Sequence, residues 1–342
     1  MAIKVGIYGA AGYTGIELVQ LLAHHPEVEL VFLTSESSSG QTMQAIWPLG
    51  PAIPLIASID APLKEVDCIF LCLPHTQSAP RAEQALAKGI RVIDLSADLR
   101  IDDPAEYARW YNVEHPAPAL LPVPYGLPEL GRDSLINANV IANPGCYATA
   151  TLLALAPLVR SEQILPHTPI IVDAKSGVTG AGRTPKVNTL FAEVHGDFSP
   201  YNIGRAHRHI AEIEQVLETE GLSPGGLIFS PHLLPTDRGI LATVYVQTSD
   251  TDAAQAALRE TYADEPLVDV LPSGQLATLR HVVRTPTAIL SVTAVNEILI
   301  IVSVLDNLLK GAASQAVQNF NLMWGLPETV GLIPTQLHQE TS

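Results

Sequence analysis

The chain has 342 residues, 47% of them hydrophobic and 16% charged, and a formal net charge of −16. This length suits two domains of ordinary size, the composition argues against disorder, and the negative charge disfavours general binding to nucleic acid. We expect no secretory leader and no membrane-spanning segment, and therefore a cytoplasmic protein without a membrane partner. The three cysteines form no metal-binding or disulfide pattern.

The chain opens with a strand, a glycine-rich turn and a helix. Residues 3–8 alternate as a strand, the turn 9–15 follows at once, and residues 16–22 form an apolar helix. This context favours dinucleotide binding, because the glycines let a pyrophosphate approach the backbone at the helix N-terminus. Glycines recur at every third position from Gly6 to Gly15, which departs from the usual G-x-G-x-x-G spacing, and a plain tight turn is the alternative.

A serine-rich segment follows the second predicted strand, residues 28–34. An acid alone at this place would favour NAD through the ribose hydroxyls, whereas serines could donate hydrogen bonds to the 2′-phosphate of NADP. The segment 35–40 carries both kinds of residue, including Glu36, so its chemistry leaves the cofactor open. A solvated loop is the alternative.

Three further apolar runs, at residues 67–73, 91–95 and 140–142, predict strands of the same sheet. Loops at the carboxyl ends of parallel strands are where open α/β sheets bind ligands. The Pro-rich segment 102–128 is expected to be irregular and to wrap the surface. The first half of the chain therefore predicts a doubly wound nucleotide-binding domain.

The segment 143–149 organises the chain. It follows the strand 140–142 and precedes an Ala- and Leu-rich helix over 148–159, so Cys146 is expected at or near a helix N-terminus. The free N–H groups there favour an anion, and they would push the thiol toward thiolate, below its free pKa of about 8.5. They could also hold an oxyanion formed by attack on a carbonyl. A small buried cysteine that closes a turn is the alternative.

The second half changes character. A strand over 170–174 leads into the Gly-rich loop 175–183, which carries two cations and suits an anion, although a mobile surface loop is the alternative. Strands in succession predict a mostly antiparallel sheet with one face on helices and the other available as a subunit interface. These strands are expected at 227–232 and 239–248 as a pair, and at 268–271, 288–294 and 299–305, with helices at 251–262 and 312–320. We expect the last helix to return to the nucleotide-binding domain.

A histidine-rich helix start follows at residues 207–213. His209 and Glu212 are three residues apart, so on a helix they share a face, and a carboxylate beside an imidazole would orient it for acid/base chemistry. A metal site is the alternative, with His207, His209, Glu212 and His232 as ligands, although their spacing matches no familiar zinc pattern.

Taken together, the motifs resemble one family. The turn 9–15, the segment 143–149, the His207–His209 motif with Glu212, and the segment 306–313 are similar to those of the N-acetyl-gamma-glutamyl-phosphate reductases of arginine biosynthesis. That family is related to the aspartate-semialdehyde and glyceraldehyde-3-phosphate dehydrogenases. The resemblance implies an α/β fold: a Rossmann-type doubly wound NADP-binding domain at 1–145 and 308–342, and an α+β catalytic and oligomerisation domain at 146–307 of the glyceraldehyde-3-phosphate dehydrogenase-like type.

The resemblance also implies an activity and a set of site residues. The activity is NADPH-dependent reduction of an acyl phosphate, N-acetylglutamyl 5-phosphate, to the semialdehyde through a thioester on Cys146. The implied assembly is a homodimer or homotetramer, and no metal is implied. The implied catalytic residues are Cys146, His209, His207 and Glu212. The implied cofactor-binding residues are Gly9, Ala11, Gly12, Tyr13, Thr14, Gly15, Ser35, Ser37, Pro74, Ser96, Asn307, Lys310 and Gly311. The implied substrate-binding residues are Arg100, Asn143, Lys175, Ser176, Arg183 and Arg205.

Some positions depart from the family pattern. Thr76 follows His75 where a His-Gly pair is expected, Asp237 stands in a segment where Met-Asn-Arg is more usual, and Glu36 stands among the serines. The last departure bears on the cofactor phosphate. A reductase for another acyl phosphate, and a nucleotide-sensing protein that keeps the fold without the chemistry, stay as alternatives.

Overall fold

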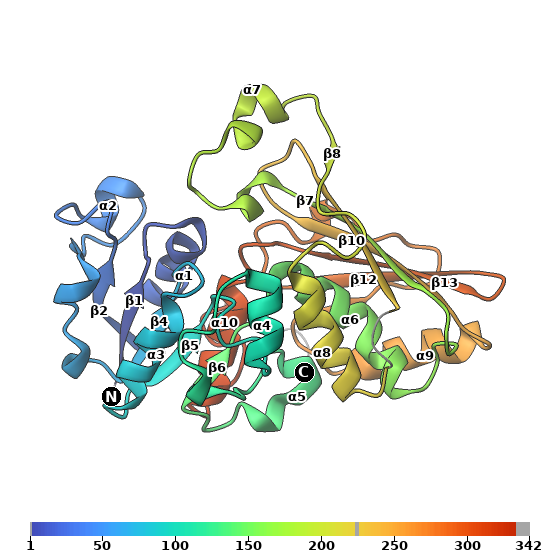
Figure 1. The fold of residues 1–342 in the computed structure, drawn as a ribbon, viewed down its shortest axis with the longest axis horizontal. Coiled ribbons are helices and arrows are strands. Elements are labelled where there is room, and N and C mark those ends of the chain that lie inside the picture. Colours follow the sequence, from blue (N-terminus) through green and yellow to red (C-terminus); the bar gives the residue numbers. More distant parts are fainter. Residues whose placement is uncertain (1, 223–225, 333–342) are drawn as a thin grey trace. The chain divides into compact units, whose positions relative to one another are not determined.

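The computed structural model describes residues 2–222 and 226–332. The chain divides into two compact units, residues 1–144 with 312–342 and residues 145–311 (Figure 1). Each unit is built on one β-sheet. No helix within the described ranges is long and apolar enough to cross a membrane.

The first unit holds a six-stranded sheet in the order β3-β2-β1-β4-β5-β6. All of its strand pairs are parallel. This is the strand order of a Rossmann sheet, and it confirms the predicted fold class. The order reverses between β1 and β4, where such sheets bind dinucleotides at the carboxyl ends of the strands. The strands are β1 (Ile3–Tyr8), β2 (Val28–Thr34), β3 (Leu55–Ile56), β4 (Cys68–Leu71), β5 (Arg91–Asp94) and β6 (Val140–Ala142).

Helices cover both faces of this sheet. Successive strand residues point to opposite faces, so Ile69 and Leu71 share a core with the alanines of α3 (Ser78–Leu86), while Phe70 meets Phe320 of α10 with ring centroids 5.7 Å apart. Helix α10 (Ala313–Met323) packs beside α1 (Tyr13–Ala23). The C-terminal helix therefore returns to the sheet that the N-terminus begins.

The prediction of an irregular segment at 102–128 is wrong in part, because the segment contains α4 (Pro104–Tyr111). Asp103 caps this helix by accepting a hydrogen bond from the Ala105 N–H at 2.8 Å, and Pro104 occupies the first helical position. The prolines thus start a helix here. The remaining short helices are α2 (Met43–Ile46), α5 (Pro128–Gly131) and α7 (Phe191–Val194), and 3₁₀ turns at Ser58–Asp60, Leu63–Glu65, Pro118–Leu120, Arg132–Ser134, Val178–Ala181, Val187–Thr189 and Leu279–His281.

The second unit holds a seven-stranded mixed sheet in the order β11-β12-β13-β10-β7-β9-β8. Most of its pairs are antiparallel, as predicted, and β7–β9 and β11–β12 are parallel. The predicted pairing of the strands at 227–232 and 239–248 is wrong, because β7 lies between them. The strands are β7 (Ile170–Ser176), β8 (Ser199–Pro200), β9 (Leu227–Leu233), β10 (Ile240–Gln247), β11 (Val268–Val270), β12 (Ala288–Val295) and β13 (Ile298–Leu305).

Three helices, α6 (Cys146–Arg160), α8 (His209–Thr219) and α9 (Thr251–Tyr262), pack against this sheet. Burial alternates along β7, β9 and β10, which is the pattern of a sheet with one covered face. The other face, here called the open face, carries apolar side chains such as Ile171 and Ile228, which are 36% and 40% exposed.

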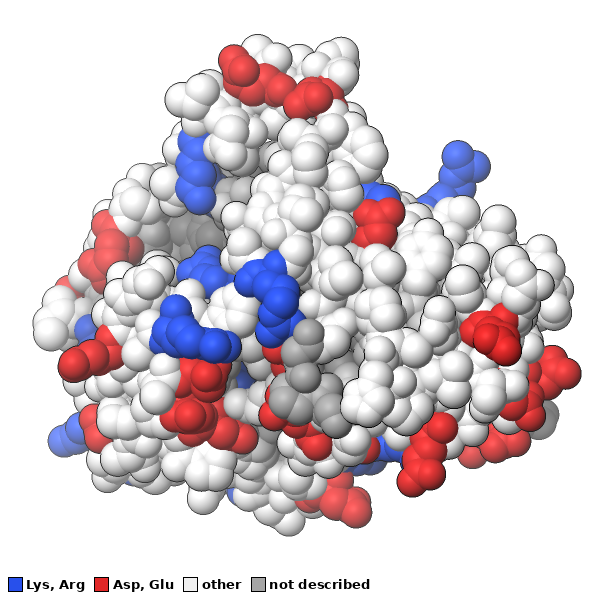
Figure 2. Space-filling model, turned by 45° about the vertical axis from the view of Figure 1, so that its right-hand side comes forward, with Lys and Arg blue, Asp and Glu red and all other residues white. Residues whose placement is uncertain are grey.

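Charged side chains follow the composition. On the face drawn in Figure 2, acidic side chains are widely spread, and Lys and Arg side chains form small groups separated by acidic and neutral ones. This distribution lacks the broad basic surface typical of nucleic-acid binding on that face.

Candidate active site

Cys146 is the first residue of α6. Gly145 precedes it as the N-cap, in an extended conformation with φ −73° and ψ 147°, and provides no side-chain cap. Every residue from Tyr147 to Val159 is buried, but Cys146 is partly exposed. The thiol therefore combines access to solvent with a helix N-terminus whose first N–H groups lack intrahelical partners. The other two cysteines lie at β4, where burial raises the thiol pKa of Cys68 and raises that of Cys72 to about 12.

The turn before Cys146 is fixed by Glu212. The Glu212 Oε1 accepts a hydrogen bond from the Gly145 N–H at 2.7 Å, and Glu212 is only 2% exposed. The sequence suggests Glu212 as a partner that orients His209, but this hydrogen bond gives it a further role. Because the bond ties α8 to the start of α6, Glu212 positions the residue that carries the thiol.

A second close approach comes from Gly311. A β-carbon at this position would lie 2.8 Å from the Cys146 Cβ and 2.7 Å from the Asn307 carbonyl oxygen. No ordinary contact between carbon atoms is that short, so the segment 307–311 can pass Cys146 only because residue 311 is glycine.

His207 lies in an aromatic environment beside Cys146. Its ring centroid is 5.5 Å from that of Tyr147, 5.2 Å from Phe229 and 5.8 Å from Tyr201. Its Nδ1 accepts a hydrogen bond from the His209 N–H at 3.2 Å. Burial, with the nearby His209 and Arg208 charges, lowers the pKa of His207 to about 2. His207 is therefore a neutral imidazole near pH 7.

His209 begins α8 and is partly exposed. Its ring centroid is 4.8 Å from that of His207 and 6.1 Å from that of Tyr147, the residue after Cys146. Since His207 is kept neutral, His209 is the better suited of the two to exchange a proton.

Two tyrosines complete this cluster, and the sequence analysis does not identify either. The Tyr201 OH donates to the Tyr147 OH at 3.1 Å, and the Tyr147 OH donates to the His232 carbonyl oxygen at 3.5 Å. Burial raises the pKa of Tyr147, and it raises that of Tyr201 to about 12, with a smaller contribution from the Cys146 charge. The adjacency of Tyr147 to Cys146 is the only sequence signal that points to them.

The structure gives no support to the metal alternative. Among the residues described, no three His, Cys, Asp or Glu side chains group as metal ligands. His232 contacts other residues: its Nδ1 lies 3.4 Å from the Asp173 Oδ1, and its ring packs against Phe198.

An ion pair and hydrogen bonds hold in place the segment after β13, which includes Gly311. Asp306 is fully buried, and its carboxylate binds the Arg238 guanidinium at 2.9 and 3.0 Å. The Asn307 Oδ1 accepts from the Gly239 N–H at 2.7 Å, and Lys310 is 0% exposed. The Asn307 side chain therefore holds this segment in place, and the contact of Asn307 and Lys310 with the cofactor stays a prediction.

The predicted substrate cations are largely committed to carboxylates. The Lys175 Nζ lies 2.5 Å from the Asp173 Oδ2, and both guanidinium nitrogens of Arg205 lie 2.7 Å from the Glu214 carboxylate. Arg183 is exposed on the loop that follows β7. Arg205 thus forms an ion pair at the surface, and its contact with substrate stays a prediction.

Lys175 and Ser176 are neighbours on β7, so their side chains point to opposite faces of the sheet. Ser176 is buried, and its hydroxyl interacts with Tyr147 of α6, on the helix-covered face of the sheet. Lys175 therefore projects to the open face, where it pairs with Asp173. Of these two predicted substrate residues, only Ser176 lies beside Tyr147, the residue that follows Cys146.

In the first unit, the glycine-rich turn packs tightly between strand and helix. Gly9 has φ +74°, and a β-carbon there would lie 2.2 Å from the Cys72 carbonyl oxygen. A β-carbon on Gly15 would lie 2.4 Å from the Gly9 carbonyl oxygen. Gly12 is the N-cap of α1 and leaves the helix N-terminus without a side-chain cap. This cradle suits a pyrophosphate. The remaining predicted cofactor residues of this unit, Ala11, Tyr13, Thr14, Ser35, Ser37, Pro74 and Ser96, follow the carboxyl ends of β1, β2, β4 and β5.

Arg100 and Asn143 act within the protein. Arg100 donates to the Asn143 and Leu95 carbonyl oxygens, both at 2.7 Å. Asn143 is fully buried, and its amide binds Asn319 and Ala312. Both residues stabilise the segment that leads to Cys146, and their contact with substrate stays a prediction.

Ser96 binds a carboxylate with a raised pKa. The Ser96 hydroxyl donates to the Asp94 Oδ2 at 2.8 Å, and burial raises the pKa of Asp94 to about 6.

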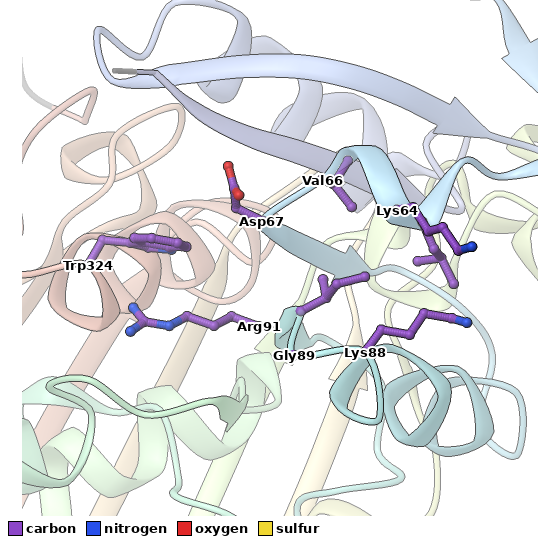
Figure 3. Close-up of a pocket in the computed structure, with 9 residues that line it drawn as sticks. Lys64, Val66, Asp67, Lys88, Gly89, Arg91 and Trp324 are labelled. Carbon is purple, nitrogen blue, oxygen red and sulfur yellow. The ribbon is translucent and has the colours of Figure 1, made fainter.

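A cavity of about 360 Å³ lies elsewhere in the first unit, at the amino ends of β4 and β5 (Figure 3). Its lining includes Lys64, Lys88, Arg91 and Trp324, and the Arg91 guanidinium stacks 4.3 Å from the centre of the Trp324 ring. Open α/β sheets bind ligands at the carboxyl ends of their strands, so this cavity is not the cofactor site.

Comparisons with known proteins agree with this division. Residues 4–138 match the family model "Semialdehyde dehydrogenase, NAD binding domain", and residues 146–307 match "Semialdehyde dehydrogenase, dimerisation domain". The chain is 45% identical to the N-acetyl-gamma-glutamyl-phosphate reductase of Geobacter sp. (strain M21), over 96% of this chain and 98% of that protein. It is 45% identical to the protein of the same name from Symbiobacterium thermophilum, over 97% of this chain and 98% of that protein.

Solved structures with a similar fold are aspartate semialdehyde dehydrogenases. That of Vibrio cholerae, complexed with ASA, has a TM-score of 0.74 at 19% identity and covers 95% of this chain and 99% of its own. That of Candida albicans, solved with NADP, has a TM-score of 0.68 at 14% identity, with the same coverages. These two likenesses concern the fold.

Proposed function

This chain belongs to the N-acetyl-gamma-glutamyl-phosphate reductase family, and we propose that it reduces N-acetylglutamyl 5-phosphate to N-acetylglutamate 5-semialdehyde with NADPH, releasing phosphate. The observation that carries this proposal is a partly exposed Cys146 at the first position of α6, on a turn that Glu212 fixes. The 45% identity to named relatives over nearly the whole chain confirms the family that the sequence motifs indicate.

The first step forms a thioester on Cys146. The sulfur attacks the acyl carbon, and the first N–H groups of α6 face the oxygen that gains charge in the tetrahedral intermediate. The C–O bond to phosphate then breaks and phosphate leaves. Glu212 contributes by fixing the turn, because the direction of the thiol depends on the Gly145 peptide.

The second step returns the sulfur to its free state. When bound, the reduced nicotinamide supplies a hydride to the acyl carbon. His209 protonates the oxygen of the resulting adduct on Cys146 and accepts that proton again as the C–S bond breaks and the aldehyde forms. His207 holds the start of α8 in place, since its neutral Nδ1 accepts the His209 N–H.

The glycine-rich turn fits the cofactor. Neither Gly9 nor Gly15 has room for a β-carbon, and the N-terminus of α1 lacks a side-chain cap. A pyrophosphate in this cradle would meet backbone N–H groups and the helix dipole. Residues 1–145 and 308–342 would then bind NADP, and residues 146–307 would carry the reaction and the oligomer contact.

The open face of the second sheet suits a second copy of the chain. It exposes Ile171 and Ile228 beside the paired Asp173 and Lys175, and the matching family model is a dimerisation domain. These features support a homodimer or homotetramer. We propose that it acts on its small-molecule substrate in the cytoplasm.

The test is a coupled pair of assays on the purified protein. N-acetylglutamyl phosphate with NADPH should consume the reduced cofactor, and the semialdehyde with phosphate and NADP should regenerate it. Cys146→Ser should abolish both reactions, with Cys72→Ser as the control that keeps them. Full turnover by Cys146→Ser would exclude the covalent route, and no turnover of wild type in either direction would overturn the proposed function.

A further inference from the structure

The loop after β2 carries a carboxylate that other residues of the loop hold in place. The Glu36 Oε1 accepts the Ser58 N–H at 2.9 Å, and the Ser58 hydroxyl donates to the Thr34 Oγ1 at 3.3 Å. The Thr34 Oγ1 in turn accepts the Gly9 N–H at 3.2 Å. Glu36 is therefore linked through three hydrogen bonds, by way of Ser58 and Thr34, to the glycine-rich turn at the carboxyl edge of the sheet.

These hydrogen bonds keep Glu36 ionised. The Ser58 hydroxyl and N–H lower the pKa of the Glu36 carboxyl, and the Arg81 charge lowers it further. Glu36 itself is exposed. A fixed, exposed negative charge thus stands where a Rossmann domain receives the ribose of the adenosine half.

Arg81 brings a positive charge to the same edge. It lies on α3, and its guanidinium carbon is 5.7 Å from the centre of the ring of Tyr8, the last residue of β1. Burial raises the pKa of the Tyr8 hydroxyl, and the Arg81 charge opposes that shift. Because its charge acts on both Tyr8 and Glu36, Arg81 lies near the ends of β1 and β2.

The serines of the loop differ in exposure. Ser35 and Ser38 are only 7% and 8% exposed, whereas Ser37 and Ser39 are exposed, so only some of the hydroxyls are open to a phosphate that arrives from solvent. A phosphate at this edge would gain most from the Arg81 guanidinium, and it would be repelled by the Glu36 carboxylate.

We propose that Glu36 and Arg81 together set the coenzyme preference of this chain, Arg81 by attracting the ribose 2′-phosphate of NADP and Glu36 by opposing it. This inference rests on the proposed function, because it concerns the coenzyme of that reaction. It goes beyond the family assignment, since it predicts that Glu36 makes the preference for NADPH over NADH weaker than Arg81 and the serines alone would give.

The experiment compares the ratio of kcat/KM with NADPH to kcat/KM with NADH in three proteins. Glu36→Gln removes the charge but keeps an oxygen that can accept the Ser58 N–H. We expect it to raise the ratio about three- to ten-fold, the range for one exposed charge acting on a multiply charged phosphate. Arg81→Gln should lower the ratio by a similar factor, about three- to ten-fold.

Matched controls change charge by the same amount at the opposite edge of the sheet. Glu65→Gln and Lys88→Gln alter exposed residues that precede β4 and β5. Both should leave the ratio unchanged. Added salt should reduce the effects of the first two variants, because screening weakens charges that are exposed to solvent.

The outcomes separate the two proposals. An unchanged ratio in Glu36→Gln, in a protein that still turns over, overturns the role of Glu36. An equal loss with both coenzymes in Arg81→Gln means that Arg81 contacts a part common to both, and overturns its role in discrimination. If the wild-type protein turns over with neither NADPH nor NADH, the proposed function is overturned instead.

Discussion

Glu212 on α8 accepts a hydrogen bond from the N–H of Gly145, the residue before the thiol, at 2.7 Å. The carboxylate is 2% exposed, so it gives up hydration to make this contact. Its function is therefore to fix the backbone direction from which α6 starts, and hence the direction of the Cys146 side chain.

Glu212→Ala is expected to leave the Gly145 N–H buried without an acceptor, which should cost about 1–3 kcal/mol of stability. Turnover should fall more than coenzyme binding, because the thiol loses its position. Glu212→Gln keeps an acceptor oxygen and should lie between wild type and Glu212→Ala in both respects. Denaturant unfolding together with kcat and the coenzyme Kd gives the comparison. Wild-type kcat in Glu212→Ala would contradict the positioning role.

Cys146 should be the cysteine that reacts with iodoacetamide in the native protein. Cys68 is buried, and the pKa of Cys72 is raised to about 12, so neither offers thiolate near pH 8. Mass spectrometry of alkylated peptides should find the label at Cys146, and Cys146→Ser should remain unlabelled until the protein is unfolded. Prior labelling of Cys72 in folded protein would contradict this account.

The two histidines should separate by their pH profiles. His209→Asn is expected to lower kcat about a hundred- to ten-thousand-fold and to remove one limb of its pH dependence, as loss of an acid/base group does. His207→Asn should lower kcat less and leave both limbs, because His207 is neutral throughout the working range. If His207→Asn loses a limb of the pH profile of kcat and His209→Asn does not, the roles assigned to the two histidines would be exchanged.

Two buried histidines should make the protein less stable in mild acid. Burial lowers the pKa of both His25 and His207, so each binds a proton more readily in the unfolded chain, whose histidine pKa is about 6.5. Their contribution is intact above that value and is lost as the pH falls below it. Between pH 7.5 and 6 the loss should be about 1 kcal/mol.

The Asp94 carboxyl has the opposite effect on the stability of the protein as the pH falls. Its pKa is raised to about 6, so its contribution is greatest below about 3.8 and is lost as the pH rises through 6. Between pH 7.5 and 6, the stability lost through the two histidines exceeds the stability gained through Asp94. The urea concentration at the unfolding midpoint should therefore fall as the pH is lowered over this range. His25→Gln keeps a donor for Asn321 and should make that fall smaller. A midpoint that rises on acidification would contradict the assignment.

Thr76 stands where the family pattern has glycine, and the structure places it at φ +71°. A β-branched residue is strained in this region, and the Thr76 N–H is held there by the Asp98 Oδ1 at 2.7 Å. Thr76→Gly should therefore raise stability by about 1 kcal/mol. Thr219→Gly, in the last turn of α8, is the control and should lower it, since glycine weakens a helix. A destabilised Thr76→Gly would show that its side chain contributes more than the strain costs.

Local patterns sufficed for the features that short segments encode. The alternation of residues 3–8, the glycines that follow, and the Pro-Gly turn before an apolar helix predict β1, the tight turn before α1 and the place of Cys146 at the start of α6. Each of these depends on neighbours within a few residues. The helix α4 was missed because its prolines were interpreted as breakers, although Pro104 stands where a helix accepts proline.

The partners of polar side chains depended on distant residues and could not be predicted. The ion pair of Arg205 with Glu214 and the hydrogen bond from the Gly145 N–H to Glu212 join residues whose pairing no local pattern indicates. The pairing of β9 with β10 failed for the same reason, since β7 comes from an earlier part of the chain. Residues that lie far apart in the sequence form no local pattern that indicates their contact, so these contacts are known only from the folded structure.

The close approach of residue 311 to Cys146, the proposed nucleophile, also constrains how this protein can vary. An alanine at that position would introduce a methyl group into the volume that the Cys146 β-carbon already fills. The constraint at the proposed nucleophile therefore extends to a position with no functional group at all, where the essential property is a missing carbon atom.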